Sequence, residues 1–147
     1  KSIYFYDQEV QTASRRSSVT MTLEDEINIS RGDMITKVAN LPVISKQFTA
    51  KIAWMDRETL KVGNKYVIQH GVNKVLAKVD RVHHTINTDF SGIVETVNEL
   101  DINDIALVSF KLNKPIFYDA FKNHRTNGSF IIINPQSNTT AGAGFIQ

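Results

Sequence analysis

The sequence has 147 residues, of which 41% are hydrophobic and 22% charged, and its formal net charge at neutral pH is +2. This composition is typical of a folded globular protein, and the length suits one complete domain with part of another. The weak positive charge excludes a domain dedicated to nucleic acid, which would carry clustered Lys and Arg. The absence of cysteine excludes thiolate catalysis, disulfide bonds and cysteine metal sites. No apolar run approaches the ~20 residues of a membrane helix.

The first 40 residues predict short strands, with an exposed polar loop at residues 8–17. Apolar and polar residues alternate in the second strand, so that Val19, Met21 and Leu23 share one face, which we expect to be buried. The predicted strands are residues 2–6, 18–23 and 34–38.

Pro42 interrupts any continuing strand and indicates a linker, so we divide the chain into residues 1–42 and 43–147. In the second part, strand-sized runs recur about every ten residues, which predicts a sandwich or a barrel. A single helical turn is expected at residues 56–60. The predicted strands, which precede a C-terminal hairpin, are residues 46–55, 66–70, 75–82, 93–97 and 105–112.

Turn residues divide the last third of the chain into further short strands. Asn127-Gly128 supplies two residues that tolerate a positive φ, and residues 134–138 place Pro135 where a turn begins. Two glycines spaced by two residues, at 142 and 144, leave room on one face of the last strand for a neighbour or a bend. The predicted strands are residues 115–118, 121–125, 129–133 and 139–146.

Two segments resemble a known family. Residues 124–133 read HRTNGSFIII and residues 138–146 read NTTAGAGFI, which is similar to the C-terminal hairpin of translation-factor-like GTPases. Within this group, the two segments resemble the large, GTP-binding subunit of sulfate adenylyltransferase. Residues 19–35, VTMTLEDEINISRGDMI, resemble the end of the second domain of that subunit, with Asn28 where the family usually has Asp.

The resemblance implies an all-β fold. Residues 43–147 would form an antiparallel Greek-key β-barrel resembling elongation factor Tu domain III, and residues 1–42 the C-terminal part of a domain II-like β-barrel. The region would be a non-catalytic part of a cytoplasmic subunit that couples GTP hydrolysis to the formation of adenylyl sulfate from ATP and sulfate. Its partners would be the catalytic small subunit and its own N-terminal GTPase domain, which would precede residue 1 and hold GTP and Mg²⁺. Neither membrane nor nucleic acid is expected as a partner.

The residues themselves predict no cofactor, metal or catalytic site. The chain lacks the Gly-x-x-x-x-Gly-Lys-Ser/Thr loop that surrounds phosphates, and residues 73–76 resemble a guanine-reading Asn-Lys-x-Asp motif but end in Leu76. His83 and His84 are adjacent in a predicted strand and should point to opposite faces, so they cannot bind one ion together. Residues 101–104 begin like a calcium loop but lack its later glycine and glutamate, which favours a strand-entry turn.

A few polar residues remain as candidates for contact with a domain or subunit. Arg125 lies in a tight turn, where its guanidinium can pair bidentately with a carboxylate across a boundary, and we group it with Asn127 and Arg31. A solvated hairpin arginine is the other interpretation. The carboxylates at residues 24–26 are expected in a solvated turn.

Other functional classes stay open at this point. The third domain of a translation elongation factor would share the fold but serve tRNA delivery. A secreted β-sandwich adhesion module is favoured only by the Arg31-Gly32-Asp33 tripeptide and by glycosylation sequons. Aromatic residues could form a base-stacking platform, although barrel core explains them better. They are Trp54, Tyr66, Phe90, Phe110 and Phe117.

Overall fold

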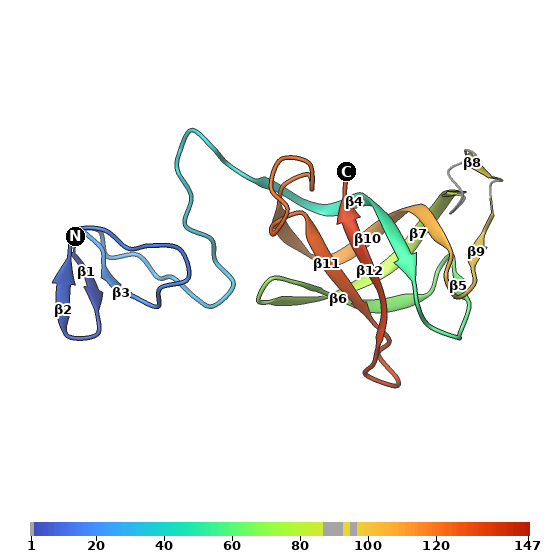
Figure 1. Ribbon diagram of the computed structural model, residues 1–147, viewed down its shortest axis with the longest axis horizontal. Coiled ribbons are helices and arrows are strands. Elements are labelled where there is room, and N and C mark those ends of the chain that lie inside the picture. Colours follow the sequence, from blue (N-terminus) through green and yellow to red (C-terminus); the bar gives the residue numbers. More distant parts are fainter. Residues whose placement is uncertain (1, 87–92, 95–96) are drawn as a thin grey trace. The chain divides into compact units, whose positions relative to one another are not determined.

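The computed structural model describes residues 2–86, 93–94 and 97–147 (Figure 1). All the regular secondary structure of these residues consists of β-strands, which confirms the predicted all-β class. The helical turn expected at residues 56–60 does not form. No helix in the described part of the chain is long and apolar enough to span a membrane. The chain divides into two compact units, Lys1–Asp33 and Met34–Gln147.

The first unit is a small antiparallel sheet in which β1 lies between β2 and β3. Tyr6, at φ 54°, reverses the chain directly after β1, so that the start of the predicted polar loop at residues 8–17 pairs as a strand instead. The strand predicted at residues 34–38 does not form. The strands of this unit are β1 (Ser2–Phe5), β2 (Gln8–Val10) and β3 (Thr20–Thr22).

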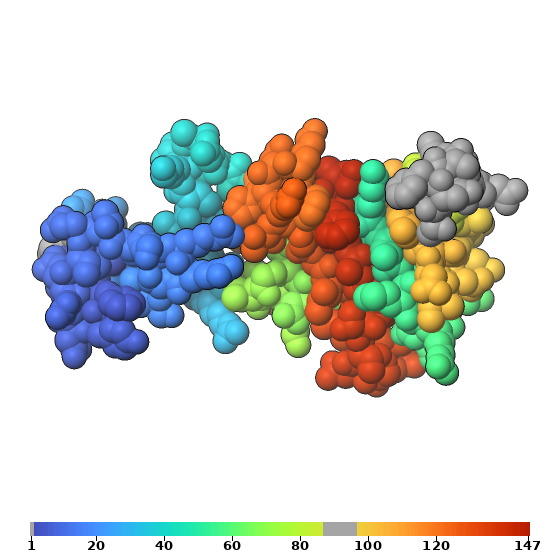
Figure 2. Space-filling model, viewed as in Figure 1, coloured from blue at the N-terminus to red at the C-terminus, as the bar shows by residue number. Residues whose placement is uncertain are grey.

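The second unit is an antiparallel barrel of six strands, in the order β10–β4–β12–β11–β6–β7, closed by the pairing of β7 with β10. Figure 2 shows the surface of β12, in red, beside that of β4, in green. Two shorter pairs join β8 (Ile93–Val94) to β7 and β5 (Leu60–Lys61) to β9 (Glu99–Leu100). Residues 95–96 of the strand predicted at 93–97 lie outside the described residues. The barrel strands are β4 (Val43–Trp54), β6 (Lys65–His70), β7 (Asn73–Ile86), β10 (Ile105–Tyr118), β11 (Ser129–Ile133) and β12 (Thr140–Ile146).

The barrel interior is formed by alternate residues of each strand, as the two-residue period predicts. Phe48 packs its ring 5.6 Å from Phe110 and 5.1 Å from Phe130, so three strands meet at one aromatic cluster. Trp54 and Tyr66 are also buried. Most of the predicted aromatic platform is therefore core rather than an exposed stacking surface; Phe90 lies outside the described residues.

Gly142 and Gly144 lie where two neighbours approach the last strand closely, as predicted. A Cβ atom on Gly142 would be 2.8 Å from the carbonyl oxygen of Ala53, and one on Gly144 would lie 2.3 Å from the Phe130 ring. Atoms cannot approach so closely without displacing their neighbours. The two missing side chains therefore let β12 pack against β4 and over the ring of Phe130.

The segment before β11 differs from prediction in two places. Residues 115–118 are not a separate strand but the end of β10, whose pairing with β4 shifts register between Lys111 and Ile116. A proline has no N–H for the ladder, so this irregularity accommodates Pro115. The strand predicted at residues 121–125 is a tight turn, because the N–H of His124 bonds back to the carbonyl oxygen of Ala120.

We expect slower hydrogen exchange in the barrel than in the first unit. None of residues 2–33 is buried, and the short strands of that unit leave their hydrogen bonds close to solvent. Exchange of the dilute monomer, followed by mass spectrometry, should show low protection before residue 40 and high protection in β4, β10 and β11. Uniform protection along the chain would contradict this prediction.

Replacing Ile132 with alanine should destabilise the barrel by about 2–5 kcal/mol, because its side chain is fully buried and its loss leaves a cavity. The matched control is Ile131→Ala on the outer face of the same strand, which should cost less than half as much. Urea unfolding of the two variants measures both values. Equal stability of Ile132→Ala and the unmodified chain would reject the role of β11 as a core strand.

Candidate functional site

The loop between β10 and β11 is closed by hydrogen bonds that converge on Asn127. The side-chain amide of Asn127 donates to Asp119 Oδ2 at 2.7 Å, and its backbone N–H donates to His124 Nδ1 at 3.0 Å. Nε2 of the buried His70 lies 2.8 Å from the Asn127 carbonyl oxygen. Because a carbonyl oxygen only accepts hydrogen bonds, His70 carries a proton on Nε2. Asn127 therefore holds the loop together and joins it to β6.

Gly128 is required by close packing inside this loop. A Cβ atom at this position would lie 2.4 Å from the Phe121 Cα atom and 2.6 Å from its nitrogen. Asn127 and Gly128 tolerate a positive φ, but neither residue adopts one in this turn. The sequence signal was correct for a turn, but the need for glycine comes from the neighbouring backbone rather than from the sign of φ.

The loop is also tied to the end of the chain. The Gly128 carbonyl oxygen accepts a 2.8 Å bond from the N–H of Ile146, and the Ile146 carbonyl oxygen accepts another from Phe121. The rings of Phe121 and Phe145 pack 4.4 Å apart. The loop backbone is thus held at both ends of its turn by β12.

Arg125 lies at the exposed tip of this rigid loop. Its carbonyl oxygen accepts a hydrogen bond from the Ser129 hydroxyl, which fixes the backbone below the side chain. In the described part of the chain, no carboxylate forms an ion pair with its guanidinium. The fold therefore presents a bidentate hydrogen-bond donor from a defined position.

A groove of about 390 Å³ borders the loop. Asp119 and His124 provide polar groups on the loop side, and the segment that precedes β4 provides apolar ones. The residues that line the groove are Met34, Ile35, Thr36, Lys37, Asn40, Pro42, Gly71, Asp119, His124, Thr126 and Asn127.

Arg31, the remaining predicted contact residue, lies in the first unit. It is exposed in a turn closed by the N–H of Asp33, which donates to the Ser30 carbonyl oxygen at 3.0 Å. Gly32 has φ 106°, a conformation that favours glycine and that this turn requires. Asn127 and Arg125 belong to one loop of the second unit, whereas Arg31 belongs to the first unit.

No group of three or more potential ligands among the described residues could hold a metal ion. His83 places Nε2 2.7 Å from the Ser109 hydroxyl on the outer face of the barrel. Residues 101–104 form the predicted strand-entry turn, in which the Asp101 N–H donates to Asp104 Oδ2 at 2.8 Å and Asn103 has φ 74°. The carboxylates at residues 24–26 are exposed, as expected.

A second polar cluster, which the sequence did not indicate, surrounds Asn134. Its buried amide lies 3.2 Å from Asp56 Oδ2 and 3.3 Å from Glu58 Oε2. The hydrogen bond from Asn134 lowers the pKa of Asp56 below its ordinary value. Asn134 lies 78 positions from Asp56 and 76 positions from Glu58 in the sequence, so only the fold brings it to these carboxylates. The same is true of His70 and Asn127.

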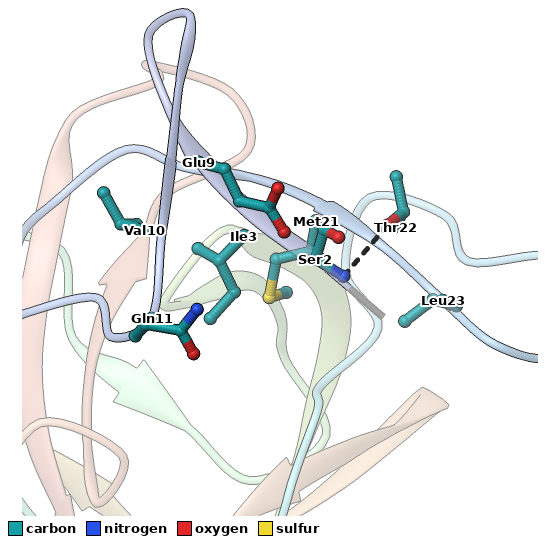
Figure 3. A pocket seen from close by; sticks show the side chains of 8 residues that line it. All are labelled: Ser2, Ile3, Glu9, Val10, Gln11, Met21, Thr22 and Leu23. Carbon is teal, nitrogen blue, oxygen red and sulfur yellow. Dashed lines mark hydrogen bonds between the residues drawn. The ribbon is translucent and has the colours of Figure 1, made fainter.

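One face of the first unit carries apolar side chains around a pocket of about 350 Å³ (Figure 3). Ile3 pairs with Val10 on one side and with Met21 on the other, so these residues form one row. The predicted burial of Met21 and Leu23 is wrong within this unit, because their side chains are 47% and 39% exposed. Three short strands supply too few side chains to cover the face.

Comparison with known proteins gives relatives over the whole chain. Sulfate adenylyltransferase subunit 1 of Colwellia psychrerythraea is 38% identical, covering 99% of this chain and 31% of that protein. The subunit 1 protein of Bacteroides fragilis is 35% identical, and the match covers 99% of this chain and 30% of that protein. The bifunctional enzyme NodQ of Rhizobium meliloti is 34% identical, and the match covers 99% of this chain and 23% of that protein. The chain thus spans less than a third of the length of these relatives.

Solved structures show the same fold. The structure of sup35 complexed with GDP superposes with a TM-score of 0.83 at 15% identity, covering 99% of this chain and 36% of that one. The structure of sup35 complexed with GMPPNP superposes with a TM-score of 0.84 and the same coverage of both chains. Residues 47–147, which include the whole closed barrel apart from the start of β4, match the GTP-eEF1A C-terminal domain-like family. The chain belongs to this family.

Proposed function

We propose that this chain is the C-terminal, non-catalytic β-barrel region of the GTP-binding subunit of a sulfate adenylyltransferase. The observation that carries the proposal is the similarity of nearly the whole chain to subunit 1 proteins of this enzyme, at 34–38% identity. The complete subunit would couple GTP hydrolysis to the formation of adenylyl sulfate from ATP and sulfate, in the cytoplasm. The barrel would serve as scaffold and docking surface.

The proposed division assigns residues 1–42 to the C-terminal part of a domain II-like barrel and residues 43–147 to a domain III-like barrel. The closed sheet that begins at Val43 supports the second assignment. The open apolar face of the small sheet, formed by Ile3, Val10 and Met21, supports the first, because a partial barrel leaves part of its inner face uncovered.

GTP and Mg²⁺ would be bound by a separate GTPase domain, because the residues of this chain do not fit a nucleotide site. The sequence has no phosphate-binding loop. Residues 73–76, which partly resemble a guanine-reading motif, are the start of strand β7, with Val75 buried and Leu76 in place of the required carboxylate.

The loop between β10 and β11 is the surface that we propose for contact with the GTPase domain or the catalytic small subunit. Arg125 would pair with a carboxylate of that partner, and Asn127 would hold the loop in the required shape through Asp119 and His70. Arg31 would make a separate contact from the first unit. The alternative of a translation elongation factor rests on sup35, whose 15% identity supports the fold alone.

The 147-residue chain should not bind GTP, since no backbone loop is available to surround the phosphates. Titration with a fluorescent GTP analogue in the presence of Mg²⁺ measures this. Saturable binding at micromolar concentration would overturn the assignment of GTP to a separate domain, while leaving the barrel fold unaffected.

Arg125→Ala should leave the stability of the chain within about 0.5 kcal/mol, because an exposed side chain has no core contacts to lose. In the assembled enzyme the same variant should weaken assembly or reduce the GTP stimulation of adenylyl sulfate formation. Urea unfolding measures the stability of the chain, and assays of the complex measure its assembly and the GTP stimulation of its activity. Arg57→Ala, which removes an exposed arginine distant in sequence from the loop, is the control. Intact assembly and intact stimulation in Arg125→Ala would reject the docking role.

A further inference from the structure

Three lysines occupy directly paired positions on adjacent strands of the barrel. Lys65 on β6 pairs with Lys78 on β7, and Lys78 pairs with Lys111 on β10. All three are exposed, while the residues next to them along each strand, such as Tyr66 and Ala77, are buried. Because side chains alternate along a strand, the three ammonium groups lie on the outer face. We name these three residues the lysine row.

The lysine row is electrostatically unfavourable for the isolated barrel. Side chains directly opposite each other have Cβ atoms about 4.5–5.5 Å apart, and like charges at such positions are destabilising. Lysine is common on exposed sheet edges, where it prevents aggregation. That reason does not apply to Lys78 and Lys111, because each of them has a paired residue on both sides in the closed sheet.

One carboxylate already binds within this surface. Asp80 places Oδ1 2.7 Å from Lys111 Nζ, and it is the additional residue at the point where the pairing of β7 with β10 shifts register. No other ion pair to the lysine row forms among the described residues. The exposed Arg81 pairs with Ser109 directly beside the row, and the Ser109 hydroxyl lies 2.8 Å from that of Thr49.

We propose that the lysine row docks an acidic protein surface, whose Asp and Glu side chains pair with Lys65, Lys78 and Lys111. The contact of Asp80 with Lys111 demonstrates that a carboxylate fits at this position. A nucleic acid fits less well, because the Asp80 carboxylate would repel phosphates and the lysine row includes no exposed aromatic side chain on which bases could stack. This surface lies outside the proposed loop contact and does not depend on the proposed function.

Charge reversal tests the proposal in the 147-residue chain. The variant Lys65→Glu with Lys78→Glu is compared with Arg15→Glu with Arg16→Glu, which changes the net charge equally at two exposed residues of the other unit. The probe is a fluorescent peptide of 12 glutamates, whose binding is measured by anisotropy at low salt. Binding of a 12-nucleotide oligouridylate, which represents nucleic acid, is measured in the same way. We expect the lysine variant to bind the peptide about tenfold more weakly and the arginine variant to bind within about twofold of the unmodified chain.

Equal loss of peptide binding in both variants would overturn the proposal, because it would show that only net charge matters. Tighter binding of oligouridylate than of the peptide would overturn it in favour of a nucleic-acid surface. Folding is checked with Lys78→Glu alone, which places a carboxylate between two lysines. Its melting temperature should equal or exceed that of the unmodified chain, and a decrease would contradict the repulsion between the lysines.

Discussion

The pairing of β7 with β10 is the constraint on which the rest of the barrel depends. It converts a row of strands into a closed sheet, so that inward residues from all six strands form one core and no barrel strand is left as an edge. The pairing requires two shifts in register, which leave His83 and Asp80 as additional residues of β7. Bulges of this kind add twist and redirect side chains. The closure of the barrel therefore also places Asp80 beside Lys111 and His83 beside Ser109.

Close approach of backbone and ring atoms is the second constraint, and glycines make it possible. Gly142 and Gly144 allow β12 to pack against β4 and Phe130, and Gly128 allows the loop before β11 to fold onto Phe121. Because β12 also bonds to both sides of that loop, the position of Arg125 is determined by the packing of the C-terminal strand. Stability of the barrel and presentation of the arginine are thus physically linked.

The two proposed surfaces differ in their physical character. Arg125 is a single guanidinium on a rigid loop, and bidentate geometry makes it suited to one specific carboxylate. The lysine row consists of long side chains with compact charges, which attract an acidic surface over a distance and accelerate association more than they increase affinity. Salt should therefore weaken contacts at the lysine row more than those of a desolvated arginine pair.

The sequence alone determined the all-β class, most of the strands and the family. These properties follow from the alternation of apolar and polar residues, from turn residues and from short sequence motifs, each of which lies within a short stretch of the chain. The tertiary structure decided what depends on distant residues: the bond from His70 to Asn127, the cluster around Asn134, the register that aligns Lys65, Lys78 and Lys111, and the turn at residues 121–125. Strand register and close backbone approach are set by pairing between segments far apart in the chain, so no local pattern specifies them.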